Sequence, residues 1–260
     1  MTARTVRWST ASPGASRTAP PDDREHDATV GNLLLRGLPA ASLDAMRSYL
    51  DVVTLGAGRV VVSPDEAIES VYFPLTGLFA ETVRLSDGSA VEVNLVGREG
   101  LSGIAVALGA GSVPIETITV VPGAFLRAPA GALREQVRVD RALADRLQRY
   151  AQTLLNVRAY SAACDRLHPI QARLARWLLK AHDRLGADEF PLTQDDLALM
   201  LGVARPSVTV NAIALQQAGL IEYRRGRIRI LDRDGLEATT CECYRAIARE
   251  FERLLGWSIG

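Results

Sequence analysis

The segment LTQDDLALMLGVARPSVTVNAIALQQAGLI, which ends at Ile221, restricts the fold more than any other part of the chain. Thr193 stands before an acidic turn and an apolar-periodic run, which is the sequence pattern of a helix N-cap. Gly202 permits the left-handed backbone with which a short helix ends. A second periodic run then carries Val208, Ala212 and Leu215. The spacing predicts two helices that cross at a tight turn, which is a helix-turn-helix.

The second of these helices begins at Arg205-Pro206. Proline suits the first turn of a helix, because its φ is preset and its missing N–H would be unpaired there. Proline also disfavours helical geometry in the preceding residue, so we expect Arg205 at or beside the N-cap, projecting beyond the helix end. An arginine there can donate two hydrogen bonds to guanine or bind a phosphate. The DNA-contacting residues expected from this segment are Thr193, Gln194, Arg205, Pro206, Ser207, Thr209 and Val210.

The next segment, LIEYRRGRIRI, alternates apolar and polar residues around a turn at Arg225-Gly226. The pattern predicts a two-stranded hairpin, or wing, with only Glu222 as a local counter-charge. Arginines on such a wing are expected to reach phosphates beside the helix-turn-helix, although a solvated basic hairpin without DNA contacts is the alternative. The wing residues expected to contact DNA are Arg224, Arg225 and Arg227, and Arg229 lies in the same basic group.

Four regions follow one another along the chain. Residues 1–28 have no hydrophobic period and predict a disordered tail. Residues 29–132 carry a short helix and then short runs rich in Val, Ile and Thr, which predict an antiparallel β-roll or barrel. Residues 133–164 predict a long helix, and residues 165–260 predict a winged helix-turn-helix domain with an extra C-terminal helix. The expected class is therefore α+β, with an N-terminal β-roll, a long dimerisation helix and a C-terminal winged helix-turn-helix.

One strand of the expected roll has a clear face pattern. Val91, Val93 and Leu95 alternate with Glu92 and Asn94 after the turn sequence SDGS. Successive side chains of a strand point to opposite faces. The alternation predicts one buried face and one solvated face.

The long helix carries an apolar stripe with steps of four and three residues. The segment has no Gly or Pro, so we expect one helix about 45 Å long. The stripe has two interpretations: it packs against the roll of its own chain, or it forms the seam of a homodimer. The length and regularity favour the homodimer. The expected seam residues are Leu143, Leu147, Tyr150, Leu154 and Val157.

Bulk composition limits the classes of function. The formal net charge is zero, so any nucleic-acid surface must be a local basic patch. No apolar run approaches the roughly 18 residues that would span a bilayer, and we expect no secretory signal and no membrane partner. The three cysteines do not form a disulfide framework, which favours reduced thiols in the cytoplasm. No nucleophile elbow, phosphate-binding loop or dinucleotide fingerprint is found, so we do not expect an enzyme.

The order of roll, long helix and winged helix-turn-helix resembles the Crp/Fnr family of bacterial transcription regulators. The resemblance is most specific in LTQDDLALMLGVARPSV, ALQQAGLI and RGRIRI, and SVYFPLTG and VGREGLSG also resemble the family's roll. It implies a homodimer on a pseudo-palindromic double-stranded DNA operator, allosteric control of that binding by the roll, and contacts with RNA polymerase.

The chain departs from the cyclic-AMP-binding branch of this family. In that branch a Gly-Glu pair holds the ribose and an Arg-Ser pair holds the phosphate. Here Gly103 matches the glycine, but Ile104 replaces the glutamate, and Pro114 and Ile115 stand where the Arg-Ser pair would fall. A cyclic phosphate would lose its charge-assisted partner. We therefore expect no response to cyclic AMP, and the effector is unknown.

The cysteines and histidines give little support to a metal or cofactor. No cysteine precedes Cys164, unlike in the iron–sulfur branch of the family. Cys241-Glu242-Cys243 is too closely spaced for the usual zinc knuckle. His26, His168 and His182 do not share a helical face, so we expect each to be structural or solvated. The sequence therefore predicts no cofactor and no metal site.

Two other functions remain open. A cyclic nucleotide or another small ligand can gate the protein through a non-standard pocket. A winged helix can also serve as a protein–protein adaptor, although an adaptor does not need Arg205 at a helix tip together with a basic wing.

Overall fold

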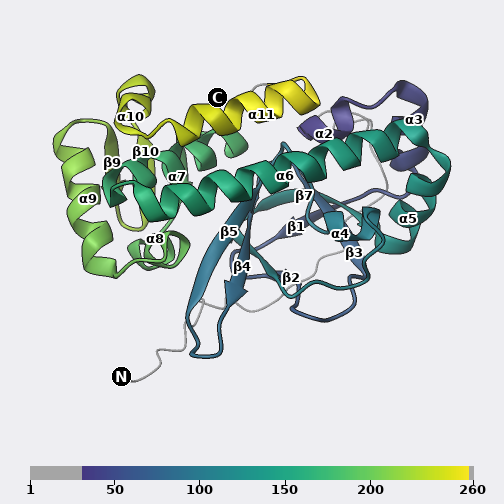
Figure 1. Cartoon of the computed structure of the whole chain (residues 1–260), viewed down its shortest axis with the longest axis horizontal. Coiled ribbons are helices and arrows are strands. Elements are labelled where there is room, and N and C mark those ends of the chain that lie inside the picture. Colours follow the sequence, from purple (N-terminus) through teal and green to yellow (C-terminus); the bar gives the residue numbers. More distant parts are fainter. Residues whose placement is uncertain (1–30, 258–260) are drawn as a thin grey trace.

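The computed structural model describes residues 31–257. The expected tail at residues 1–28 and the residue His26 therefore lie outside the described residues. A β-roll occupies one end of the molecule and the helix-turn-helix the other, and the long helix α6 (Arg141–Leu167) connects them (Figure 1). The C-terminal helix α11 (Cys243–Leu255) runs along α6 on the side away from the sheets (Figure 1).

Two antiparallel sheets form the roll, one of three strands in the order β1-β7-β3 and one of four strands in the order β2-β6-β4-β5. The turn sequence SDGS closes the β4–β5 hairpin, as its sequence indicated. Buried aromatic side chains from both sheets meet between them, because Phe79 stacks on Phe125 with ring centroids 4.5 Å apart. The strands are β1 (Asp51–Leu55), β2 (Val60–Val62), β3 (Ser70–Pro74), β4 (Leu78–Arg84), β5 (Ala90–Val96), β6 (Glu116–Val121) and β7 (Gly123–Pro129).

Short helices close the roll, and one of them corrects the expected course of the long helix. The segment from residue 133 is not continuous with α6, because the backbone is extended at Asp140. The Asp140 side chain accepts hydrogen bonds from the backbone N–H groups of Ala142 and Leu143, so it caps a new helix. The helices beside the roll are α2 (Leu33–Arg36), α3 (Ala40–Arg47), α4 (Ile104–Ala107) and α5 (Ala130–Val139).

The apolar stripe of α6 is buried inside its own chain. The five expected seam residues are between 0% and 3% exposed, and they share one core cluster with the roll and with α11. Ile247 and Phe251 of α11 belong to this cluster. The assignment of Leu143, Leu147, Tyr150, Leu154 and Val157 to a homodimer seam is therefore wrong for this conformation, and the alternative of packing within the chain is correct.

The C-terminal half packs helices around a small sheet of order β8-β10-β9. Apolar residues of α7, α8 and α9 form its core with Phe190 and Ile228 from the sheet. Among the described residues no single helix has the length and apolarity needed to cross a membrane. The elements are α7 (Ile170–Leu185), β8 (Glu189–Pro191), α8 (Gln194–Leu201), α9 (Arg205–Gln217), β9 (Ile221–Arg224), β10 (Arg227–Ile230) and α10 (Arg233–Thr239).

The polar face of β5 is not solvated, which corrects the face pattern expected from its sequence. Asn94 is 1% exposed and donates a hydrogen bond to Glu81, and the side chain of Glu92 is 5% exposed. Helix α7 covers this face and supplies Trp177 and Lys180 as partners of Glu92. The polar residues of β5 therefore join the roll to the C-terminal half.

Candidate nucleic-acid interface

Helix α8 begins and ends at the residues that its sequence indicated. Thr193 is the N-cap and forms a capping box with Asp196, in which each side chain bonds the backbone N–H of the other residue. Gly202 is left-handed, with φ of 62°, at the C-cap. The axes of α8 and α9 meet at 109°, which lies in the range of helix-turn-helix motifs.

Helix α9 begins at Arg205, with Pro206 in its first turn and Ala204 as the N-cap. This start follows from proline chemistry, as expected. The Arg205 side chain is 58% exposed and has one long ion pair, in which Nε lies 3.7 Å from Oδ1 of Asp195. The guanidinium therefore keeps most of its hydrogen-bonding capacity at the tip of the helix.

One face of α9 packs on the core and the other is exposed. Val208, Ala212 and Leu215 are 0–1% exposed, as their spacing predicted. Val210 and Ile213 lie on the other face and are 67% and 45% exposed.

Two of the expected contact residues bond each other. The Thr209 hydroxyl donates to Oε1 of Gln194 at 2.6 Å, which links the starts of α8 and α9. Asn211, whose position the sequence left unexplained, donates to the carbonyl of Ser207 one turn earlier. Both bonds fix side chains at the exposed end of α9, beside Arg205 and Pro206.

The wing is a tight hairpin. Arg225 and Gly226 have φ of 51° and 73°, so both central residues of the two-residue turn are left-handed, as in a type I′ turn. Ile228 pairs with Tyr223 and Ile230 with Ile221, as the alternation predicted. The strand β8, which the sequence reading missed, pairs with β10 and makes the wing a three-stranded sheet.

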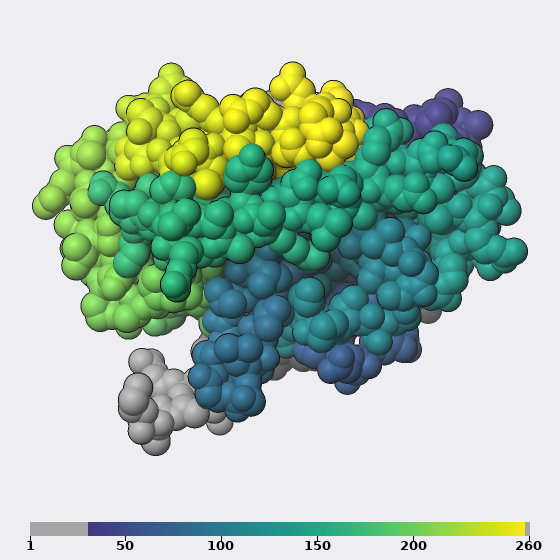
Figure 2. All heavy atoms as spheres, in the orientation of Figure 1, coloured from purple at the N-terminus to yellow at the C-terminus, as the bar shows by residue number. Residues whose placement is uncertain are grey.

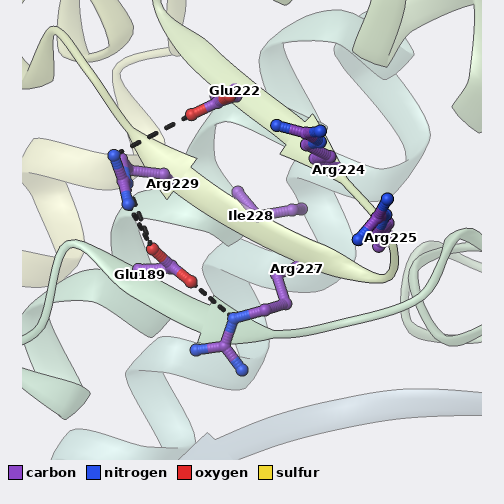
Figure 3. A pocket seen from close by; sticks show the side chains of 7 residues that line it. All are labelled: Glu189, Glu222, Arg224, Arg225, Arg227, Ile228 and Arg229. Atoms are coloured by element: carbon purple, nitrogen blue, oxygen red, sulfur yellow. Dashed lines mark hydrogen bonds and ion pairs between the residues drawn. The ribbon is translucent and has the colours of Figure 1, made fainter.

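The wing arginines fall into two groups (Figure 3). Arg227 and Arg229 bond the carboxylate of Glu189, and hydrogen bonds from Arg227 and Arg229 hold the pKa of that carboxyl below its usual value. Arg224 and Arg225 form no ion pair within residues 31–257 and extend at the turn. The expectation that only Glu222 offsets the basic group was wrong, because Glu189 arrives on β8 from outside the hairpin sequence. All these residues line an open hollow of about 440 Å³.

A second group of candidate ligand side chains lies where α6 meets α7, and the sequence did not indicate that its members meet. Cys164, His168, Cys241 and Cys243 place one ligand atom each within 4.8 Å of all the others. Metal-ligand motifs in a sequence are recognised from closely spaced residues, whereas Cys164 and Cys241 are 77 residues apart. No local signal in the sequence shows that they meet.

Comparisons with known proteins agree with this geometry. A family profile described as a Crp-like helix-turn-helix domain matches residues 172–239. This range covers most of α7, the helix-turn-helix, the wing and α10. A search of curated protein sequences finds no match.

Solved structures share this fold over about three quarters or more of the chain. FixK2 from Bradyrhizobium japonicum is 18% identical with a TM-score of 0.64, and the match covers 74% of this chain and 98% of that chain. TTHB099, a CRP-family transcriptional regulator from Thermus thermophilus, is 19% identical with a TM-score of 0.59, covering 80% and 98%. The c-di-GMP responsive global regulator CLP from Xanthomonas campestris is 13% identical with a TM-score of 0.59, covering 74% and 99%. At these identities the likeness establishes the fold.

The matched domain supplies the function that the fold alone does not. A Crp-like helix-turn-helix with an exposed arginine at the tip of its second helix stands on the roll-and-helix architecture of Crp/Fnr proteins. The chain is therefore a DNA-binding transcription regulator with a Crp-like helix-turn-helix domain, and its fold is similar to that of solved Crp/Fnr-family structures.

Proposed function

We propose that this regulator binds a pseudo-palindromic operator as a homodimer, with the start of α9 in the major groove and the wing on the flanking phosphates. The observation that carries the proposal is Arg205, which is 58% exposed at the tip of α9. Its one ion pair, to Asp195, is 3.7 Å long, so binding to DNA would break only this weak contact. The first turn of a recognition helix is the part that reaches base edges in this motif. A guanidinium there matches guanine O6 and N7.

The other exposed groups of α9 have supporting roles. In this proposal Val210, which is 67% exposed, contacts a thymine methyl group, and Ser207 donates to a phosphate or a base edge. Thr209 and Gln194 hold the starts of the two helices together and become available only if their mutual bond opens. Arg224 and Arg225 supply the phosphate contacts of the wing. Arg227 can contact a phosphate only after its hydrogen bond to Glu189 breaks.

The homodimer needs a surface other than the buried stripe of α6. The exposed side of this helix also has steps of four and three residues, and Figure 2 shows part of α6 uncovered between α11 and the roll. Leu155, which is 59% exposed, is the large apolar residue of one exposed series, in which Gln152 precedes it and the small residues Ala159 and Ala162 follow it. Small residues allow two helices to approach closely around a leucine. The exposed series is Gln148, Gln152, Leu155, Ala159, Ala162 and Arg166.

The roll is the candidate effector domain, and we propose that it does not bind cyclic AMP or cyclic GMP. Ile104 is 9% exposed and belongs to an apolar cluster with Ile68 and Val71. A less charged ligand fits such an interior better than a phosphate does. The proposal places the protein in the cytoplasm, includes contacts with RNA polymerase, and assigns the chain no catalytic activity.

Footprinting of the purified protein across its own genome, followed by electrophoretic shifts over a salt series, tests this function. Specific fragments should be retained, and their affinity should fall steeply as salt rises, because bound phosphates release counterions. A protein–protein adaptor would show no footprint and no such salt dependence.

A further inference from the structure

The end of α6 and the start of α11 bring together all three cysteines of the chain and one histidine. Cys164, Cys241 and Cys243 are 0%, 9% and 4% exposed, and each is a free thiol. His168 is the C-cap residue of α6 and directs Nδ1 at the sulfur of Cys243, 3.7 Å away. We propose that these four side chains bind one Zn²⁺ ion in a structural Cys₃His site.

The spacing of the ligand atoms fits a single tetrahedral ion. Bonds of about 2.3 Å from zinc to sulfur and about 2.0–2.1 Å to nitrogen put two sulfurs about 3.8 Å apart, and a sulfur and a nitrogen about 3.6 Å apart. The sulfurs of Cys164 and Cys241 are 3.4 Å apart, the Cys243–His168 distance is 3.7 Å, and no pair exceeds 4.8 Å. A small adjustment of rotamers therefore places four ligands around one ion.

The histidine has the outer partner that metal-binding histidines usually have. Its other nitrogen, Nε2, lies 3.4 Å from Oε2 of Glu242. A carboxylate at this position fixes the tautomer, so that Nδ1 presents its lone pair to the ion. Glu242 stands between two of the cysteines in the sequence, so the same short segment supplies two ligands and this second contact.

The surroundings also offset the charge of the filled site. Zinc with three thiolates and a neutral imidazole carries a net charge of −1. Arg176 is 5% exposed and lies within electrostatic reach of Cys164 and Cys243. Its Nε is buried and has no hydrogen-bond partner. A buried cation with an unused donor suits an anionic site of this kind.

A disulfide accounts for less of this arrangement. A bond between Cys164 and Cys241 would need the sulfurs to close from 3.4 Å to about 2.05 Å. It would also leave Cys243 and His168 with no role. Binding of zinc uses all four groups and releases the three thiol protons to solvent.

The position of the site points to what the ion does. Cys164 and His168 lie where α6 turns into α7, and Cys241 and Cys243 lie where α10 turns into α11. The ion would tie the joint between the long helix and the DNA-binding half to the helix that runs along α6. An effect on DNA affinity rests on the proposed function, whereas the binding of zinc does not.

The metal content of the full chain, purified under reducing conditions without a histidine tag, tests the proposal. We expect about one zinc per chain. After zinc is removed, Co²⁺ should produce thiolate-to-cobalt charge-transfer absorption together with the bands of a tetrahedral ion. Cys164→Ser and Cys243→Ser should each weaken zinc binding by at least about 100-fold, and Glu242→Gln by about 10-fold. His182→Asn, at a histidine outside the cluster, should bind zinc as the wild type does.

Three results would overturn the site. The first is a wild-type chain that retains no zinc and shows no charge-transfer band with Co²⁺, a measurement that does not depend on how the variants fold. The second is full zinc occupancy in both serine variants. The third is a metal-free protein in which Cys164 and Cys241 form a disulfide and zinc is not taken up after reduction. If zinc binds but its removal leaves operator affinity unchanged, the site holds and its link to DNA binding is wrong.

Discussion

Lys180 on α7 and Glu92 on β5 form an ion pair, with Nζ and Oε1 3.3 Å apart and each side chain 5% exposed. Lys180 is the only lysine of the chain. Burial lowers its pKa to about 8, and the charge of Glu92 limits that decrease. The indole of Trp177 donates to the other oxygen of the same carboxylate. One buried charge pair therefore joins the roll to the DNA-binding half.

Removing one member of this pair should destabilise the protein more than removing both. Glu92→Gln leaves the Lys180 ammonium buried without a counter-charge, and the expected loss is about 3–5 kcal/mol of unfolding free energy. The double variant Glu92→Leu/Lys180→Met should lose less, since no unpaired charge remains. Urea unfolding of the singles and the double measures the difference. Equal and additive losses would show that the two charges do not interact.

The Glu92–Lys180 pair also shows which features of the fold could not be predicted from the sequence. The capping box at Thr193, the left-handed Gly202 and the helix start at Arg205 were predicted correctly, because neighbouring residues determine them. Glu92 was expected in solvent, because alternation identifies two faces of a strand but does not show that a distant helix covers the polar one. The covering helix lies more than eighty residues later.

The same limit explains the seam of α6 and the arginines of the wing. The stripe through Leu147 was detected correctly as apolar, but periodicity does not show whether a partner, the roll or α11 covers it. Arg227 was treated as free because its partner Glu189 lies on a strand too short to give a signal of its own. Features that neighbouring residues determine, such as helix caps and apolar stripes, could therefore be predicted from the sequence. Contacts between distant segments could not.

Arg205 and Arg225 should respond differently to substitution by alanine. Arg205→Ala should cost about 1–3 kcal/mol of operator binding and relax discrimination at one base position. Arg225→Ala should weaken all sequences alike and reduce the salt slope by about one unit, because it contacts only phosphate. Arg138→Ala, on the exposed side of α5, is the matched control. Fluorescence anisotropy on operator and scrambled DNA measures both effects, and a uniform loss with Arg205→Ala would make Arg205 a phosphate contact.

Leu155 should be needed for the homodimer. Leu155→Asp places a charge at the centre of the exposed face of α6, and light scattering should then report a monomer that binds the operator weakly. Leu108→Asp, at a leucine of the roll that is 57% exposed, should stay dimeric. Leu147→Asp should instead unfold the chain, because Leu147 is 1% exposed in its own core. A Leu155→Asp variant that remains a dimer would move the interface away from this face.

Asp183 should make the protein sensitive to acid. Burial alone would raise the pKa of this carboxyl, but the His182 imidazole 3.8 Å away, a hydrogen bond from Tyr244 and the charge of Arg233 outweigh burial and hold the pKa below its usual value. A lowered pKa stabilises the folded state above the ordinary aspartate pKa of about 3.9, and this stability is lost as the pH falls through the folded value. Unfolding free energies measured across this range should decrease less steeply in Asp183→Asn. An unchanged slope would show that Asp183 does not carry the effect.

Cyclic AMP and cyclic GMP should neither bind to the roll nor change operator affinity. The turn that would hold the ribose has Gly103 in a left-handed conformation with φ of 92°, but the following Ile104 offers no acceptor. A phosphate would also need a cation, and of the two nearby arginines one is already paired and the other packs against Gly186 with its Nε buried and without a hydrogen bond. Arg127 of β7 pairs with Asp51 of β1 at 3.0 Å, and the guanidinium of Arg98 lies against Gly186 of the DNA-binding half.

Calorimetric titration of each nucleotide, with operator affinity followed in parallel, checks this expectation. Neither measurement should change, because burying a phosphate charge without a partner costs far more than the apolar contacts would gain. Micromolar binding with a shift in operator affinity would contradict it. In that event Arg98→Ala and Arg127→Ala identify the cation. The variant that abolishes nucleotide binding shows which arginine moves from its present position to contact the phosphate. Arg98 contacts Gly186 at the end of α7. If a phosphate in the roll drew Arg98 away, ligand binding would therefore change the contact between the roll and α7.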